Sequence, residues 1–348
     1  MMESKKEKIK NFDPNSYAAD DSNIFGLPFS AEESDVVLIP VPWEVTVSYS
    51  TGTASGPQAI LDASKQVDLF SLSVPNAWKK GICMTEIPAD IAKKSKALRK
   101  KSEKYLDELF SGKVSEKGND ILKEINKECH KLNEKVKEQC GYWLDRNKVV
   151  GLVGGDHSTP LGFIQALSER HESFSILQID AHADLRNAYE GFAYSHASIM
   201  YNAKQIKQVS NLVQVGIRDL CEAEYKIIGK SRDHIITFYN EFIMNQKMEG
   251  NHWKNITDTI INHLGDKVYI SFDIDGLDPK YCPNTGTPVP GGLEFGEAVY
   301  LIRKVAESGR TIIGFDLNEV APGKDEWDAN VGARMLFEMC NWAALSQK

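Results

Sequence analysis

The sequence contains seven short runs rich in Val, Ile, Leu and Phe, separated by longer amphipathic segments. The runs span residues 35–40, 149–153, 175–179, 212–217, 234–238, 267–272 and 311–315. Several of them are continuously apolar, which is typical of strands covered on both faces. Helix-length segments occur at 159–170, 222–229, 252–263 and 293–308. This repeated alternation predicts an α/β fold with three αβα layers, a central mostly parallel sheet and right-handed crossovers.

Two regions depart from this alternation. Residues 86–147 are rich in Lys and Glu and carry Leu, Ile and Tyr at helical spacing. They predict a helical pair on the side of the sheet, broken near 111–118. We expect a solvated structural insertion, with a lid or an oligomer contact as the alternative. Residues 1–34 are polar with little periodicity, so we expect an N-terminal arm, followed by a single domain over 35–348.

Composition excludes several classes of partner and location. The 348 residues carry a net charge of −8, which argues against a nucleic-acid or membrane-surface partner. No apolar run approaches the ~18 residues of a membrane-spanning helix, and the first residues lack the apolar stretch of a signal peptide. The six cysteines are scattered without a CxxC pair. Reduced thiols in a cytoplasmic protein are the simplest interpretation.

The stretch Q-I-D-A-H-A-D-L-R, residues 178–186, follows one of the predicted strands directly. Asp180, His182 and Asp184 alternate with other residues, so an extended backbone would place all three on one side. Ligands of such sheets bind beyond the carboxyl ends of the strands. On this motif alone, a metal site and a structural role in helix capping or lysine pairing are equally supported.

Two more clusters follow two other predicted strands. V-G-G-D-H-S (153–158) offers His157 after a pair of glycines, and S-F-D-I-D-G-L-D-P (271–279) offers Asp273 and Asp275. Two histidines and four aspartates then give six candidate ligands. These are too many for one catalytic ion with an open position, and they suit two ions about 3.5–4 Å apart that share carboxylates and a water. Oxygen and nitrogen donors without cysteine favour Mn²⁺ or a similar first-row ion.

G-G-D-H-S (154–158), D-A-H-A-D (180–184) and D-I-D-G-L-D-P (273–279) resemble the three signature motifs of the ureohydrolases, the arginase/agmatinase family. Their order is the same, and S-Y-S-T-G-T-A-S-G-P-Q-A-I (48–60) is similar to the G-x-x-x-G-P loop that enters the first helix of the family. The resemblance runs from about residue 36 to the C-terminus and is interrupted by 86–147. It implies an arginase-like fold with a dinuclear metal site at the strand ends.

The resemblance also implies roles for the ligands. One manganese would be held by His157, Asp180, Asp184 and Asp273, and the other by Asp180, His182, Asp273 and Asp275, so that Asp180 and Asp273 bridge. The pair of ions would activate a shared water, which attacks the guanidinium carbon and yields urea and an amine. Asp184 would accept the remaining proton of that water. Nickel is the alternative metal, because it accepts the same donors.

Two further residues match positions around this centre in the family. His196, in E-G-F-A-Y-S-H-A-S, matches an active-site histidine that is a proposed proton shuttle to the departing amine. Glu319, in D-L-N-E-V-A-P, matches the acid that binds the guanidinium, which a carboxylate can hold through two hydrogen bonds. A family-like oligomer, a trimer or hexamer of identical chains, is implied as well.

The choice of substrate depends on less specific segments. L-R-N-A-Y-E-G-F-A-Y-S-H (185–196) is similar to agmatinases rather than arginases. Residues 319–334, with Trp327, depart from the agmatinase pattern and resemble a subgroup that includes guanidine hydrolases. Trp327 either packs the last helix, which we favour, or closes the pocket over a small cation. Agmatine or a related guanidino amine is the first expectation and free guanidine the second.

Other functions remain as alternatives. A formimidoylglutamase would need cations for the carboxylates of its substrate, which Arg186 and Arg218 could supply, and a guanidinobutyrase is a further alternative. A two-metal phosphoesterase is disfavoured because the chain lacks a G-N-H-[DE] element. A catalytically silent binding subunit is disfavoured because all six ligands are intact.

Overall fold

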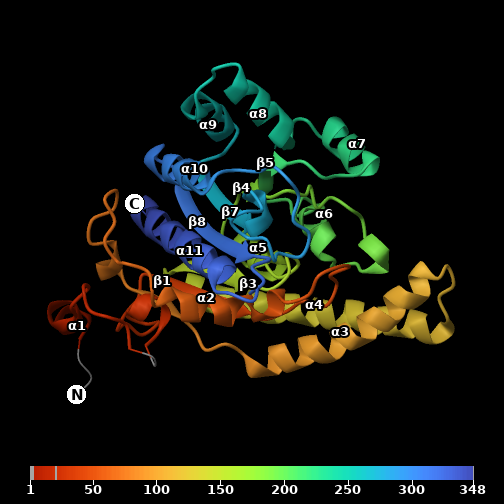
Figure 1. Cartoon of the computed structure of the whole chain (residues 1–348), viewed down its shortest axis with the longest axis horizontal. Helices are drawn as coiled ribbons and strands as arrows, with labels where there is room; N and C mark the ends of the chain where they lie inside the picture. Colours follow the sequence, from red (N-terminus) through yellow and green to blue (C-terminus); the bar gives the residue numbers. More distant parts are fainter. Residues whose placement is uncertain (1–3, 20–21, 348) are drawn as a thin grey trace.

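The computed structural model describes residues 4–19 and 22–347, and its centre is an eight-stranded, entirely parallel sheet (Figure 1). The strand order is β2-β1-β3-β8-β7-β4-β5-β6. The strands are β1 (Val36–Val41), β2 (Ile82–Met84), β3 (Val149–Gly154), β4 (Phe174–Ile179), β5 (Val209–Ile217), β6 (Ile235–Tyr239), β7 (Lys267–Asp273) and β8 (Thr311–Asn318). All seven expected strands are confirmed. Strand β2 was missed, because three residues are too short to give a recognisable apolar run.

Helices cover both faces of this sheet. They are α1 (Lys5–Asn11), α2 (Gly56–Ser64), α3 (Ala89–Phe110), α4 (Glu116–Leu144), α5 (Leu161–Ser168), α6 (Ile199–Ala203), α7 (Glu222–Lys230), α8 (Asn240–Met248), α9 (Trp253–Asn262), α10 (Phe295–Glu307) and α11 (Trp327–Ser346). Among the helices of the described residues, none has both the length and the apolar character needed to cross a membrane.

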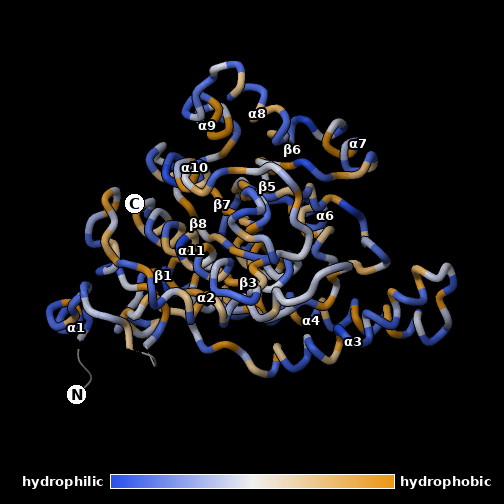
Figure 2. Tube along the Cα trace, viewed as in Figure 1, coloured by the Kyte–Doolittle hydropathy of each residue, from blue (hydrophilic) through white to orange (hydrophobic). Residues whose placement is uncertain are grey.

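The core forms two apolar clusters, one on each face of the sheet. Alternate residues of β1 show the division, because Val36 and Leu38 join one cluster and Val37 and Ile39 join the other. The first cluster includes residues of α2, α9, α10 and α11, and the second includes residues of α3 to α7. Hydrophobic residues accordingly gather along the central strands (Figure 2). The three-layer αβα architecture is confirmed.

The region 86–147 forms the expected helical pair. Helices α3 and α4 lie side by side along one side of the molecule and reach beyond the sheet (Figure 1). Ile125, Leu132 and Val136 on the inner face of α4 are buried in the second cluster, and exposed Ser115 caps the N-terminus of the helix by accepting from the amide of Gly118. The loop between the helices is shorter than expected, at 111–115. The pair therefore covers part of one face of the sheet.

The N-terminal segment joins the first cluster. Ile24, Phe25, Leu27 and Phe29 are buried, and the ring of Phe12 packs on Trp78 at 5.2 Å between centroids. The division into an arm (1–34) and a single domain (35–348) with an insertion stays a prediction.

Candidate metal centre and substrate pocket

Four adjacent strands in the middle of the sheet carry the predicted site residues at their carboxyl ends. In spatial order these are β3, β8, β7 and β4. They lead to His157, to Glu319, to the pair Asp273 and Asp275, and to the Asp180–Asp184 motif. Parallel strands place all their carboxyl ends at one edge of the sheet. Segments more than 100 residues apart in sequence therefore meet at one place.

The turn after β3 needs its glycines. A Cβ on Gly155 would collide with the backbone carbonyl of Trp43, and a Cβ on Gly154 would collide with the side chain of Asn318. The missing side chains let the backbone lie against the end of β1 and turn at once into His157. The amide N–H of His157 then donates to Oε1 of Glu319 at 2.8 Å. This bond fixes the position of His157 relative to the end of β8.

The ends of β4 and β7 are joined to each other by side-chain to backbone bonds. Oδ1 of Asp275 accepts from the amide of Ala181 at 3.0 Å, and Oδ1 of Asp273 accepts from the amide of Asp275 at 2.9 Å. Asp184 has a left-handed backbone (φ 53°), so the extended alternation expected from the sequence does not continue through it. Its carboxylate nevertheless turns back toward His157.

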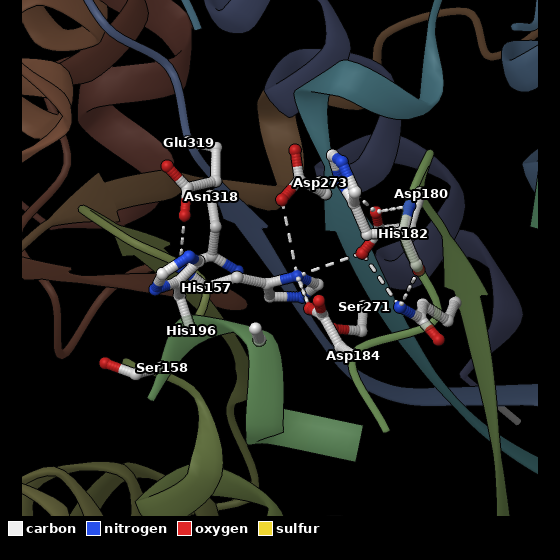
Figure 3. A network of polar contacts seen from close by, with 12 residues as sticks. His157, Ser158, Asp180, His182, Asp184, His196, Ser271, Asp273, Asn318 and Glu319 are labelled. Carbon is white, nitrogen blue, oxygen red and sulfur yellow. Dashed lines mark hydrogen bonds and ion pairs between the residues drawn. The ribbon is translucent and has the colours of Figure 1, made fainter. Parts of the chain in front are cut away.

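The six predicted ligands converge. Figure 3 shows His157, Asp180, His182, Asp184 and Asp273. Nδ1 of His157 lies 3.1 Å from Oδ2 of Asp180, 3.1 Å from Oδ2 of Asp184 and 3.3 Å from Oδ2 of Asp273. Nδ1 of His182 lies 3.0 Å from Oδ2 of Asp275 and 3.7 Å from Oδ1 of Asp180.

Two groups in the described residues have potential ligand atoms within 4.8 Å of one another: His157, Asp180 and Asp273, and Asp180, His182 and Asp275. Asp180 belongs to both. Asp273 belongs to the first group alone, whereas the family resemblance implied that it also bridges.

The electrostatics of this cluster suit bound cations. Four carboxylates lie close together and are almost fully buried. Burial, and then the neighbouring Asp180, raise the pKa of Asp184 to about 7. Burial, Asp275 and Asp180 raise the pKa of Asp273 well above its usual range. Nδ1 of His157 is buried without a hydrogen bond of good geometry. Buried charges need a partner, and imidazole and carboxylate donors in this number fit first-row divalent ions.

A buried chain of hydrogen bonds, not predicted from the sequence, supports His157 at Nε2, the ring nitrogen that does not face the carboxylates. Nε2 of His157 lies 2.9 Å from Oγ of Ser271, which donates to Oδ1 of Asp316 at 3.0 Å. If Nε2 carries the proton, Nδ1 is left as an acceptor facing the carboxylates. Such partners of a metal-binding histidine fix its tautomer and orientation. The signal in the sequence is a polar residue at a buried position of each strand, Ser271 in β7 and Asp316 in β8.

His196 and Glu319 line the same cavity as the ligands. Burial, followed by the proximity of His182 and His157, lowers the pKa of His196 to about 3, so its imidazole is neutral at physiological pH. Its Nδ1 lies 3.4 Å from Oγ1 of Thr46. Burial, and then Asp156, raise the pKa of Glu319 well above its usual range.

The cavity has a volume of about 460 Å³ and opens at the carboxyl edge of the sheet. Besides predicted site residues, its lining includes Ser48, Tyr49, Ser50, Arg186, Tyr189, Ala197, Asp219, Glu224, Gly286, Thr287, Pro288 and Val289. A larger hollow of about 900 Å³ lies between the N-terminal segment and residues 65–69. Neither group of candidate ligands lies in that hollow, so the smaller cavity is the candidate active site.

Trp327 and Arg218, two residues with a possible part in substrate choice, are both engaged by backbone carbonyls. Trp327 is the first residue of α11, and its indole N–H donates to the carbonyl of Lys280 at 2.9 Å. It does not line the cavity, which agrees with a packing role. The guanidinium of Arg218 donates to the backbone carbonyls of Asp275, Leu277 and Val289, within 3.2 Å of each. It is therefore engaged in holding the loop after β7.

Comparisons with known proteins agree with this geometry. A model of the Arginase family matches residues 34–341. The N(1)-aminopropylagmatine ureohydrolase of Thermus thermophilus is 31% identical over 88% of this chain and 89% of its own length. The agmatinase of Bacillus subtilis is 27% identical over 88% of this chain and 91% of its own length.

Solved structures share the fold. The agmatine ureohydrolase of Thermoplasma volcanium has a TM-score of 0.70 at 20% identity and covers 98% of both chains. The proclavaminate amidino hydrolase of Streptomyces clavuligerus has a TM-score of 0.72 at 22% identity, over 96% of this chain and 100% of its own. Together with the family match, these findings confirm the resemblance drawn from the three motifs. The chain belongs to the arginase family and is a ureohydrolase.

Proposed function

We propose that this chain uses two divalent ions to hydrolyse a guanidino amine, with agmatine as the first candidate, to urea and an amine. The observation that carries the proposal is the meeting of the six candidate ligands at a cavity that Glu319 and His196 also line. Glu319 would bind the guanidinium group of the substrate beside the ligands. Manganese is the first candidate metal and nickel the alternative.

The proposed ligands follow the family pattern. His157, Asp180, Asp184 and Asp273 would hold one ion, and Asp180, His182, Asp273 and Asp275 the other. The distances between Nδ1 of His157 and its three carboxylate neighbours, and between His182 and Asp275, support this division. When bound, two such ions lower the pKa of a water between them and so supply a nucleophile at neutral pH.

The side chains of the cavity would handle the substrate and its protons. Glu319 is buried, and a guanidinium cation beside it favours its ionised form, which can accept two hydrogen bonds and would hold the planar group and its carbon in place. Asp184 would accept the proton that remains on the attacking oxygen. As a buried carboxylate at the cavity, Asp184 is placed to accept and return this proton.

His196 would serve the leaving group. Its imidazole is neutral, and the hydroxyl of Thr46 lies near Nδ1, which leaves Nε2 for the substrate. The reaction balances when the water oxygen bonds to the guanidinium carbon and the bond from that carbon to the substituted nitrogen breaks. Urea gains the water oxygen, and both protons of the water end on the departing nitrogen, which leaves as an ammonium group. His196 would pass one of them to the amine nitrogen.

The cavity supports a guanidino amine over the alternatives. A volume of about 460 Å³ is in the range of pockets for small organic ligands and far exceeds what guanidine alone would fill. Guanidinobutyrate and formiminoglutamate carry carboxylates that need free cations. Both arginines near the cavity already have partners. The guanidinium of Arg218 donates to backbone carbonyls. The guanidinium of Arg186 lies 4.6 Å from the centroid of the Tyr189 ring, and its Nε lies 3.5 Å from Oε2 of Glu224.

The test is product release from metal-loaded protein with five compounds: agmatine, guanidine, arginine, guanidinobutyrate and formiminoglutamate. Urea is measured for the first four and formamide for the last. The proposal expects the highest kcat/KM with agmatine or a longer guanidino amine. Fastest turnover of guanidine would replace the proposed substrate. No turnover of any compound, with both ions bound, would support a silent binding subunit.

We also propose a cytoplasmic homo-oligomer, a trimer or hexamer, as the family resemblance implies. The six cysteines are free thiols and most are buried, which suits a reducing compartment. Light scattering coupled to size-exclusion chromatography gives the mass directly. A single species at the mass of one chain would contradict the oligomer.

A further inference from the structure

A strained turn forms part of the rim of the cavity. Ala188 and Glu190 have left-handed backbones, with φ of 47° and 54°, and Gly191 follows with φ of 85°. Left-handed conformations are unfavourable for residues with a side chain, and they persist only where the surrounding structure holds them. We call residues 188–191 the rim turn. Contacts from other parts of the chain must therefore stabilise the rim turn.

The contacts come from the helical pair. The hydroxyl of Tyr105, on α3, donates to the carbonyl of Glu190 at 2.8 Å. The amide group of Asn126, on α4, donates to the carbonyl of Gly191 at 3.1 Å and accepts from the backbone N–H of Ala193 at 2.8 Å. Three hydrogen bonds from two helices thus bind backbone groups of the rim turn and of the residues that follow it.

Close packing reinforces these bonds. A Cβ on Gly191 would lie 2.8 Å from the hydroxyl of Tyr105 and 3.0 Å from the side chain of Leu122 on α4. The ring of Tyr105 also packs edge-on against Phe192, with 5.3 Å between centroids. The helices and the turn are therefore in direct contact, and a shift of either helix would move the turn.

The rim turn carries groups that face the substrate. Tyr189 lines the cavity, and its ring lies at right angles to the imidazole of His196, with 6.4 Å between centroids. The guanidinium of Arg186 lies 4.6 Å from the centroid of the same ring. Oε2 of Glu190 accepts from the hydroxyl of Ser48, another lining residue, at 2.9 Å. Displacement of the turn would therefore reshape one wall of the cavity.

We infer that Tyr105 and Asn126 are positioning residues for substrate binding, and that the α3–α4 pair acts through them to hold the rim turn against the cavity. This gives the 86–147 region a role in substrate binding, beyond covering the sheet. The inference rests on the proposed function: with the guanidinium at Glu319, the wall formed by the turn would face the part of a guanidino amine that extends beyond that group. The positions of the metal ligands and of Glu319 do not depend on the rim turn.

The test compares Tyr105→Phe and Asn126→Ala with matched controls on α4. Tyr142→Phe removes the hydroxyl of a half-exposed tyrosine that contacts Trp143 and Arg146, and Asn119→Ala changes an exposed asparagine. For agmatine, each test variant should raise KM roughly 3- to 10-fold, the effect of one or two hydrogen bonds. The kcat and the metal content should stay unchanged, and the controls should match the parent protein.

Hydrogen exchange provides a readout independent of turnover. Backbone amides of residues 188–195 should exchange faster in both test variants, while those of β4 and β7 keep their protection. Unchanged KM and unchanged exchange would overturn the inference. Loss of metal, or a fall in kcat with KM constant, would overturn it as well, because the helices would then support the metal centre instead. If no guanidino compound is turned over, the proposed function fails, and exchange alone still decides whether the helices hold the turn.

Discussion

Replacement of Glu319 by Gln tests how the substrate is held. The carboxylate is 6% exposed and lies at the cavity, so solvent would weaken its attraction for a guanidinium very little. The amide oxygen of Gln can still accept from the N–H of His157, a bond of 2.8 Å in the parent protein. The change therefore removes the charge and one acceptor without removing the support of the neighbouring ligand.

The magnitude follows from the two hydrogen bonds to the guanidinium. The amide leaves one of these two bonds unmade, and a bond to a charged group contributes about 1.5–3 kcal/mol. At 1.36 kcal/mol for each factor of ten, kcat/KM for agmatine should fall about 10- to 150-fold. KM should rise and kcat should fall, because the guanidinium is both bound and positioned by this group.

The assay is urea release together with metal analysis of the same preparations. Glu326→Gln is the matched control, because Glu326 is exposed beside α11 and contacts Gln66 rather than the cavity. The control should retain the activity of the parent, and both variants should retain both ions. Unchanged kinetics in Glu319→Gln would refute guanidinium binding by this residue. Loss of metal would show that Glu319 acts by supporting His157.

Three further predictions concern the metal centre. Asp273→Ala should lose metal and all activity, because the proposed ligand set makes its carboxylate a ligand of both ions; retention of both ions by elemental analysis would contradict the ligand assignment. Ser271→Ala should weaken metal binding about 10- to 100-fold in a competition titration with a chelator, because His157 loses its partner at Nε2. Unchanged affinity would show that this partner is dispensable. Chelated protein should lose thermal stability as pH rises from 5 to 8. Burial, and then Asp180, raise the pKa of Asp184 from 3.8 to about 7. Burial lowers the pKa of His182, but Asp275 and Asp180 outweigh it and raise this pKa from 6.5 to about 12. In that range the unfolded chain releases protons that the folded chain keeps, so both groups disfavour folding as pH increases. Metal-loaded protein should lack this slope, and an equal Tm across the range for chelated protein would disprove the reasoning.

The sheet was predictable because its strands are buried on both faces. Their apolar runs are long enough to recognise, and the exception is β2, whose three residues give no pattern. The parallel arrangement followed from the alternation of strands and helices. Given that arrangement, the convergence of His157, Asp180 and Asp273 followed too, because carboxyl ends of parallel strands share one edge.

The remaining features depend on contacts between distant residues, which spacing along the chain does not reveal. The bond of Ser271 to Asp316 joins two strands that lie side by side in the fold and are 45 residues apart in sequence. The hydrogen bond from Tyr105 to the carbonyl of Glu190 joins residues that are 85 positions apart in sequence. The left-handed backbone of Asp184 was also missed, because its sequence pattern is that of an extended strand.

Anomalous diffraction from crystals of the metal-loaded protein tests the dinuclear centre most directly. Data collected at the absorption edge of the bound metal should give two peaks per chain, about 3.5–4 Å apart. One should lie among His157, Asp180 and Asp184, and the other beside His182 and Asp275. A single peak, or peaks away from these side chains, would contradict the two-metal hydrolase proposed here.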